Sequence, residues 1–228
     1  MMKAQPPQTR AFTRTELVAV LAVLGLFTTL FVHAQLDPQE KAKRDRIMCV
    51  SQLKQVGLAF RLWSNDNNDK FPMQVEAKRG GSKEAIQAGE PYRHFQAMAN
   101  ELNKAKILAC PSDDREIAPD FNHLKSVNIS YFVGLDADES RPQMFLSGDR
   151  NITNGVAPKK GILELSDKPE AGFTQAIHND AGNIGLADGS VRQFTSLFLR
   201  RQVEVAKKFN DGGKTRIQLP EAGSSSAE

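Results

Sequence analysis

The chain has 228 residues, which is enough for one helix that spans a membrane and one separate domain. Its formal net charge is only +3, and acidic residues interrupt its basic ones, so the composition argues against a nucleic-acid partner, which would need a basic patch with interleaved aromatic residues. The sequence holds no serine-hydrolase elbow, zinc-protease helix, phosphate-binding loop or dinucleotide fingerprint, and we therefore expect no enzyme activity and no cofactor.

The first predicted element is an apolar helix near the N-terminus. No formally charged side chain lies between Glu16 and Asp37, and the run has no polar stripe. At a rise of 1.5 Å per residue, about 20 apolar residues cross roughly 30 Å of hydrocarbon. The run therefore predicts a transmembrane helix over 12–36, after a short basic leader over 1–11. The alternative is an ordinary secretory signal peptide that is cut after the apolar run.

The residues at the start of this run resemble the type IV prepilin signature: the small residue Ala11, then Phe12, and Glu16 as the fifth residue of the mature chain. The resemblance implies that a prepilin peptidase cuts between Ala11 and Phe12 and that the new amino group of Phe12 is methylated. It also implies that Glu16 pairs with that amine on a neighbouring copy, since a carboxylate in lipid is costly unless it is paired. The sequence departs from the family pattern at Ala11, where Gly is usual, and at Arg14, where an apolar residue is usual.

The prepilin resemblance also gives the chain a location and partners. Basic residues flank the apolar run on both sides, so charge alone does not orient it. The resemblance implies a single pass through the inner (cytoplasmic) membrane, with the N-terminus in the cytoplasm and the C-terminal domain in the periplasm or otherwise outside the cytoplasm. The implied partners are the prepilin peptidase, membrane lipid, and other copies or related pseudopilins in a filament.

Two cysteines, Cys49 and Cys110, fit a domain that folds in an oxidising compartment. A disulfide between them would close a loop of about 60 residues and contribute about 4 kcal/mol in the chain-entropy model. We favour this disulfide over the alternative, which is two buried free thiols.

A second predicted helix forms the soluble half of a long N-terminal helix, over 37–70. Asp37 followed by a proline is a helix start signal, and apolar residues then recur at three- and four-residue steps from Ile47 to Trp63. A turn rich in Asn and Asp begins at Asn65 and ends the helix. This turn lacks the ligand spacing of a calcium-binding loop.

Residues 71–215 are predicted to form a globular domain. Short alternating or apolar runs, bounded by Gly, Pro, Asn and Asp, predict strands. The remaining residues are predicted to be a disordered tail, over 216–228. The fold class is therefore α+β, with the long N-terminal helix packed on a small antiparallel β-sheet, an arrangement that resembles a pilin. The expected elements are a helix over 92–106, strands over 107–113, 128–134, 143–147 and 160–165, a hairpin over 184–191, and a helix over 197–209.

The hairpin carries the most specific motif of the domain. Apolar residues alternate with small ones before Asp188-Gly189, which predicts a two-residue turn with Leu186 opposite Val191. Nine residues separate His178 from Asp188. Together with the prepilin-like start, this spacing resembles the H-X9-DG family of prepilin-like proteins, to which the segments around both cysteines are also similar.

The function predicted from these features is structural. His178 could form a metal set with Asp180 and Asp188, but we favour a brace in which the imidazole bonds to backbone and fixes the loop that enters the hairpin. The resemblance implies a pilin-like or pseudopilin subunit of a type IV pilus or type II secretion-like filament. A membrane-anchored binding module that does not polymerise is the alternative, and an envelope hydrolase that uses His178 is the least favoured hypothesis.

Overall fold

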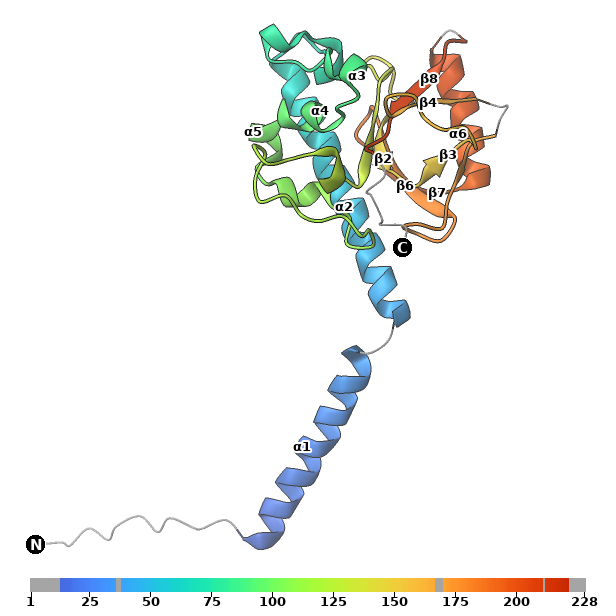
Figure 1. Ribbon diagram of the computed structural model, residues 1–228. Coiled ribbons are helices and arrows are strands. Elements are labelled where there is room, and N and C mark those ends of the chain that lie inside the picture. The colour runs from blue at the N-terminus through green and yellow to red at the C-terminus, as the bar shows by residue number, and fades with distance from the viewer. Residues whose placement is uncertain (1–12, 36–37, 167–169, 211, 222–228) are drawn as a thin grey trace, which may run out of the picture. The chain divides into compact units, whose positions relative to one another are not determined.

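The computed structural model of the chain describes residues 13–35, 38–166, 170–210 and 212–221 (Figure 1). The chain divides into two compact units, one up to Ala42 and the other from Lys43 onward. We call the second unit the head. The residues of the predicted cleavage site, Ala11 and Phe12, lie outside the described residues.

The first unit contains helix α1, Arg14–Gln35. The first turn of α1 contains the charged Arg14 and Glu16. Among the described residues, no helix is both long enough and apolar enough to cross a membrane. This finding contradicts the predicted transmembrane helix and, with it, the predicted single-pass location in the inner membrane with a periplasmic domain.

The predicted second helix is present as α2, Pro38–Asn65. Helix α1 is described up to Gln35 and α2 from Pro38, and residues 36–37 between them lie outside the described residues. Proline suits the first position of a helix, because its missing N–H would have no partner there. The predicted apolar stripe begins at Ile47, but that side chain is 60% exposed, and burial begins at Cys49. The stripe then follows the predicted positions Leu53, Val56, Phe60 and Trp63.

A series of short helices follows α2 in the sequence. The helix predicted over 92–106 is two helices, and Asn103, with a φ of 64°, ends the second. The strand predicted over 107–113 is wrong, because Ile107 enters the core from a 3-10 helix and Pro111 has no N–H for a β-ladder. The short helices are η1 Pro72–Gln74, η2 Ala77–Arg79, α3 Ala85–Ala88, α4 Tyr92–Gln96, α5 Ala99–Leu102, η3 Ala105–Leu108 and η4 Ser126–Asn128.

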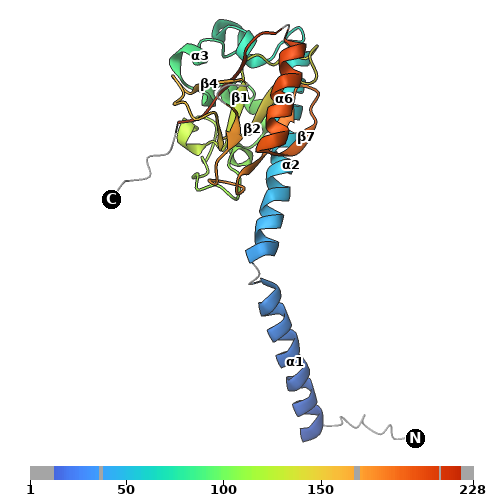
Figure 2. The same cartoon turned by 90° about the vertical axis from the view of Figure 1, so that its right-hand side faces the viewer.

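A six-stranded antiparallel sheet forms the centre of the head, so the predicted α+β class with an antiparallel sheet is correct. Its strand order is β4-β8-β1-β2-β6-β7. Helix α2 lies on one face of the sheet and α6, Ser196–Phe209, lies on the other, as two views agree (Figures 1 and 2). The strands of the sheet are β1 Tyr131–Gly134, β2 Phe145–Asp149, β4 Ile162–Leu165, β6 Ala181–Leu186, β7 Val191–Thr195 and β8 Thr215–Gln218, while β3 Ile152–Thr153 and β5 Gly172–Phe173 pair separately.

Strand β8 has a central position that the sequence did not indicate. It lies between β4 and β1 and pairs antiparallel with both. Gln218 is fully buried, and its Oε1 is 2.9 Å from Nε2 of His94. The predicted disordered tail is therefore wrong for residues 216–218, whereas residues 222–228 lie outside the described part of the chain. This strand could not be predicted from its polar composition, because His94, the partner of the buried Gln218, is far away in the sequence.

Candidate functional site

Cys49 and Cys110 form a disulfide that joins α2 to the segment after η3. Both cysteines are almost fully buried, and no cysteine is free, so the alternative of two thiols is not present. The bridge spans 61 residues of sequence. By restricting the unfolded chain, a bridge of this span contributes about 4 kcal/mol to the free energy of unfolding.

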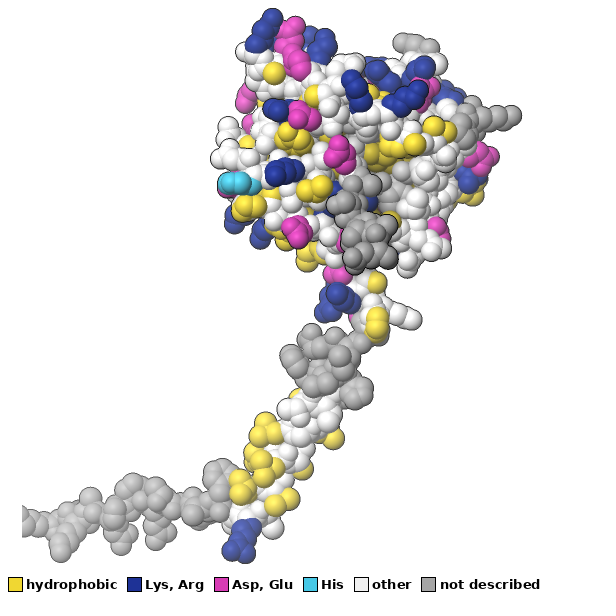
Figure 3. Space-filling model, in the orientation of Figure 1, with side chains coloured by type: hydrophobic (Ala, Val, Ile, Leu, Met, Phe, Trp, Pro, Cys, Tyr) yellow, Lys and Arg dark blue, Asp and Glu magenta, His cyan; other side chains and the backbone are white. Residues whose placement is uncertain are grey.

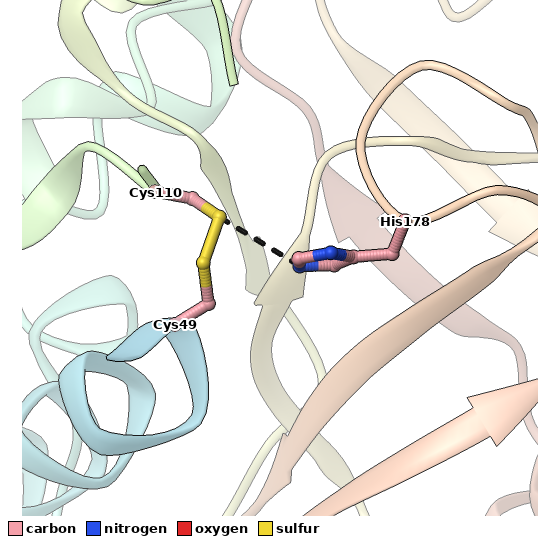
Figure 4. Close-up of side chains that lie close together, drawn as sticks. All are labelled: Cys49, Cys110 and His178. Carbon is pink, nitrogen blue, oxygen red and sulfur yellow. Dashed lines mark hydrogen bonds between the residues drawn. A yellow bond between two sulfur atoms is a disulfide. The ribbon is translucent and has the colours of Figure 1, made fainter. Parts of the chain in front are cut away.

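The imidazole of His178 lies beside the disulfide (Figure 4). Its Nε2 is 3.7 Å from Sγ of Cys110 and 3.4 Å from Oδ2 of Asp149, a residue of β2. The backbone carbonyl of His178 accepts a hydrogen bond of 2.8 Å from Nη2 of Arg46 on α2. His178 therefore does fix the loop that enters the hairpin, but through its carbonyl, while the imidazole contacts side chains rather than the predicted backbone.

Asp149 is a buried carboxyl group with incomplete hydrogen bonding. Its Oδ2 accepts hydrogen bonds of 2.6 and 2.9 Å from the backbone N and Nδ2 of Asn183 on β6. Its Oδ1 is buried and has no hydrogen-bond partner among the described residues. Burial raises the pKa of Asp149 to about 7, although the bonds from Asn183 oppose this rise. The group is thus close to half protonated at neutral pH.

His178 and Asp149 do not form an ion pair at neutral pH, despite their short distance. Burial lowers the pKa of His178 to about 4, and the nearby charge of Arg46 acts in the same direction. The imidazole is therefore neutral near pH 7. A neutral imidazole keeps a lone pair on one ring nitrogen, and that lone pair can bind a proton or a metal ion.

A charged pair flanks the disulfide. Arg150 donates hydrogen bonds of 2.8 and 2.7 Å to the two carboxylate oxygens of Asp113. Burial acts to raise the pKa of Asp113, but the hydrogen bonds and charge of Arg150 outweigh it and hold that pKa below its usual range. Arg150 therefore neutralises Asp113 and not the adjacent Asp149.

The turn at the other end of the motif is longer than predicted. Gly185 pairs with Val191, and the backbone N of Leu186 donates to the carbonyl of Ser190 at 2.9 Å. The loop is therefore the three residues 187–189, and the predicted pairing of Leu186 with Val191 is wrong. Gly189 has a φ of +82°. A three-residue loop needs a positive φ at its last position alone, which explains why glycine stands there.

Both ends of the H-X9-DG motif pack on α2. At the first end, His178 contacts Arg46 and the disulfide, as described above. At the second end, a Cβ added to Gly57 of α2 would lie 3.7 Å from Cα of Gly189, and Nη1 of Arg61 donates to the carbonyl of Asp188 at 3.3 Å. Residues 46 and 61 are about 22 Å apart along a helix axis. The two ends of the motif thus attach the hairpin to α2 at positions about four helical turns apart.

The metal set considered from the sequence is not assembled. Asp180 is exposed and bonds to Gln175, and Asp188 is exposed at the turn. Within the part of the chain that the structure describes, the group of His, Cys and acidic residues that could hold a metal ion is Cys49, Cys110 and His178. Sequence reasoning missed Asp149 and Asn183, since both lie in strands and only the fold brings them to His178.

Glu16 lies in the first turn of α1 and is exposed. Its Oε2 accepts hydrogen bonds of 2.9 Å from the backbone N and from Oγ1 of Thr13, and its own N donates to that Oγ1 at 3.3 Å. This is a reciprocal capping box, whose Thr-x-x-Glu signal was visible in the sequence. The bonds from Thr13 hold the pKa of Glu16 below its usual range, so the carboxylate is charged at neutral pH.

In comparisons with known proteins, no family model matches the chain, and no curated protein or solved structure is significantly similar to it. The prepilin and H-X9-DG resemblances are therefore carried by the residues quoted above. Any functional conclusion has to come from those residues and from the geometry of the described part of the chain.

The packing of the hairpin on α2 predicts opposite results for two substitutions at Gly57. Gly57→Ala should keep or raise the free energy of unfolding, because a Cβ at 3.7 Å makes ordinary contact and Ala exceeds Gly in helix propensity by about 1 kcal/mol. Gly57→Leu should lower that free energy by about 1 to 3 kcal/mol, because the larger side chain pushes the hairpin away. Urea unfolding measures both. Equal stability of the two variants would show that the hairpin does not pack on α2 here.

Asp149 and His178 should have opposite effects on the pH dependence of stability. With a folded pKa of about 7, Asp149 keeps a proton that the unfolded chain loses, so its contribution to the free energy of unfolding falls from about pH 4 to about pH 7. With a folded pKa of about 4, His178 stays neutral while the unfolded chain binds a proton, so its contribution rises from about pH 4 to about pH 6.5. These two slopes nearly cancel each other in the natural chain. The buried His94, whose pKa burial also lowers to about 4, adds a rising slope that is present in every variant.

Each substitution should therefore expose the slope of the other group. For Asp149→Asn we expect the free energy of unfolding to rise more steeply with pH than in the natural chain over this window, and for His178→Gln less steeply, in each case by up to about 1.4 kcal/mol per pH unit. Urea unfolding at a series of pH values measures both slopes. His123→Gln, at an exposed histidine, is the matched control and should keep the profile of the natural chain. Unchanged profiles in both test variants would refute the perturbed pKa values.

Proposed function

We propose that the chain is a pilin-like subunit of a type IV pilus or type II secretion-like filament, in which α1 packs against the same helix of neighbouring copies. The observation that carries this proposal is the apolar surface of α1 (Figure 3). Many of its large hydrophobic side chains are between 47% and 66% exposed: Leu17, Val18, Val20, Leu21, Val23, Leu24, Leu26 and Phe27.

These apolar positions lie all round the helix, because successive residues turn by about 100° and the set leaves no wide polar stripe. Exposed apolar surface of this extent marks an interaction site, and burying one such side chain gives about 1.5 to 3 kcal/mol. A single docked partner would cover one side of α1 only. Several neighbouring helices cover all sides, which favours a filament core over a one-to-one complex.

The head does not need α1 for its own core, which supports the proposal further. The buried hydrophobic residues of the described chain begin at Cys49 and form one cluster. The apolar side chains of α1 are therefore available for contacts between copies while the head stays folded. In a filament, such a head would form the outer surface.

Glu16 supplies the charge that a filament needs for register. A carboxylate surrounded by apolar helices is costly unless a cation pairs with it, so it favours the one arrangement that brings a neighbour's terminal amine into contact. The capping box with Thr13 offers a different role, in which Glu16 only starts its own helix. These two roles can be separated, because glutamine also completes a capping box but carries no charge.

Glu16→Gln should therefore abolish assembly although α1 still forms. Two full-length copies with different tags are co-expressed, and the recovery of one copy with the other, together with the sedimentation of the complex, measures assembly. We expect the recovery to fall at least about tenfold, which corresponds to the loss of about 1.4 kcal/mol per contact. Glu40→Gln, an exposed acid in the first turn of α2, is the matched control and should assemble normally.

Normal assembly of Glu16→Gln would show that the carboxylate acts only as a cap. A natural chain that stays solitary at all concentrations would contradict the filament itself and would favour a binding module that does not polymerise.

The proposal also predicts the mature N-terminus. Mass spectrometry of the chain purified from its native cells should find Phe12 as the first residue, with one methyl group on its amino nitrogen. An intact leader would leave the amine of Phe12 in a peptide bond, so that it could not pair with Glu16. A chain that starts near Gln35 would instead indicate an ordinary signal peptide.

A further inference from the structure

The buried centre around the disulfide combines the ligand types of a zinc site. One ligand atom from each of Cys49, Cys110 and His178 lies within 4.8 Å of the others, and all three residues are buried. The sulfur atoms face the edge of the imidazole ring (Figure 4). Asp149 approaches the same ring nitrogen, with its Oδ2 at 3.4 Å from Nε2 of His178.

We propose that reduction of the Cys49–Cys110 disulfide converts this centre into a Zn²⁺ site, with the two cysteine sulfurs, Nε2 of His178 and a carboxylate oxygen of Asp149 as its four ligands. Two thiolates, one imidazole and one carboxylate form a donor set that suits tetrahedral zinc. This inference concerns the head alone and does not depend on the proposed filament.

The distances in the disulfide form are already close to those of a zinc site. With a zinc–sulfur bond of about 2.3 Å and zinc–nitrogen and zinc–oxygen bonds of about 2.0 to 2.1 Å, tetrahedral ligands lie roughly 3.6 Å (S to N) and roughly 3.3 Å (N to O) apart. The observed distances are 3.7 Å from Sγ of Cys110 to Nε2 of His178 and 3.4 Å from that nitrogen to Oδ2 of Asp149. The two sulfurs have to separate, which breaking their bond permits, and the Asp149 carboxylate has to move toward them.

The surroundings of the centre suit a metal ion. Oδ1 of Asp149 is buried without a hydrogen-bond partner among the described residues, so the carboxyl group still has an unused acceptor. Asn183 donates two hydrogen bonds to Oδ2, the oxygen that lies 3.4 Å from Nε2 of His178, and thereby orients the carboxylate, as the groups behind metal ligands generally do. A zinc ion with two thiolates and one carboxylate has a net charge of −1, and the guanidinium of Arg46, which bonds to the carbonyl of His178, lies close enough to balance it.

The conversion balances in electrons and protons. An external dithiol reduces the disulfide: the S–S bond breaks, each cysteine sulfur gains one electron and one proton, and the dithiol is oxidised to its own disulfide. Zinc then forms bonds to both sulfurs and releases the two thiol protons. The neutral His178 keeps its one ring proton on Nδ1 when Nε2 binds zinc, and Asp149 releases a proton if it holds one. The metal joins the same two cysteines as the disulfide, so both states tether α2 to the same segment.

The test uses the full chain, reduced with a phosphine under nitrogen, and Co²⁺ as a visible probe for the zinc site. We expect one Co²⁺ per reduced chain, with thiolate-to-cobalt charge-transfer absorption and the intense visible bands of a tetrahedral ion, and we expect Zn²⁺ to displace it. The oxidised chain should show neither band. His178→Ala and Asp149→Ala should each weaken binding by about 100-fold or more, whereas His123→Ala, at an exposed histidine, should bind normally.

The reduced chain can lose its fold when the disulfide is broken, and the test remains decisive in that case. If circular dichroism shows an unfolded reduced chain, Zn²⁺ should restore the spectrum of the oxidised form, because binding to four ligands that only the fold brings together is coupled to folding. Absence of metal binding by the reduced chain, with no recovery of structure, would overturn the proposal. Unchanged affinity in either His178→Ala or Asp149→Ala would overturn it as well.

Discussion

The attachment of the β6–β7 hairpin to α2 at both ends is the constraint on which the head depends. At one end the carbonyl of His178 bonds to Arg46 beside the disulfide, and at the other Gly189 packs on Gly57. Strands β6 and β7 stand at one edge of the sheet, and the other strands follow β6 in the strand order. The attachment of the hairpin to α2 therefore sets which face of the sheet packs on that helix. Helix α6 can then close the opposite face. One helix and one hairpin thus determine the layers of the whole domain.

This attachment includes a buried carboxyl group that stability alone would not favour. Asp149 lies in the core with one oxygen unbonded, and its pKa is raised to about 7 because burial disfavours the charged form. A hydrophobic residue of similar volume is often at least as stable in such a position. Burial in the same centre keeps His178 neutral. The buried carboxyl group of Asp149 therefore lowers the free energy of unfolding of the head. Proteins more often keep a destabilising group of this kind where it serves a function.

Local signals in the sequence predicted much of this fold, and long-range pairing accounts for the failures. Helix α2, helix α6, strands β1, β2 and β4 and the β6–β7 hairpin follow directly from the spacing of apolar residues and from caps and turns. Strand β8 was missed because its buried Gln218 is polar and gains its partner, His94, only in the folded head. In the candidate site, Cys49, Cys110 and His178 were visible as motif residues. Asp149 was not, since nothing near it in the sequence points to His178.

The two units of the chain differ in where their apolar side chains lie. The head buries its apolar residues in its own core, whereas the apolar side chains of α1 remain exposed. Contacts made by α1 can therefore form or break without changing the core of the head, and a change of redox state at Cys49 need not alter the surface of α1. Glu16 fits this division, since its capping bonds are all within its own unit. The assembly surface proposed for α1 and the metal site proposed for the head can therefore act independently of each other.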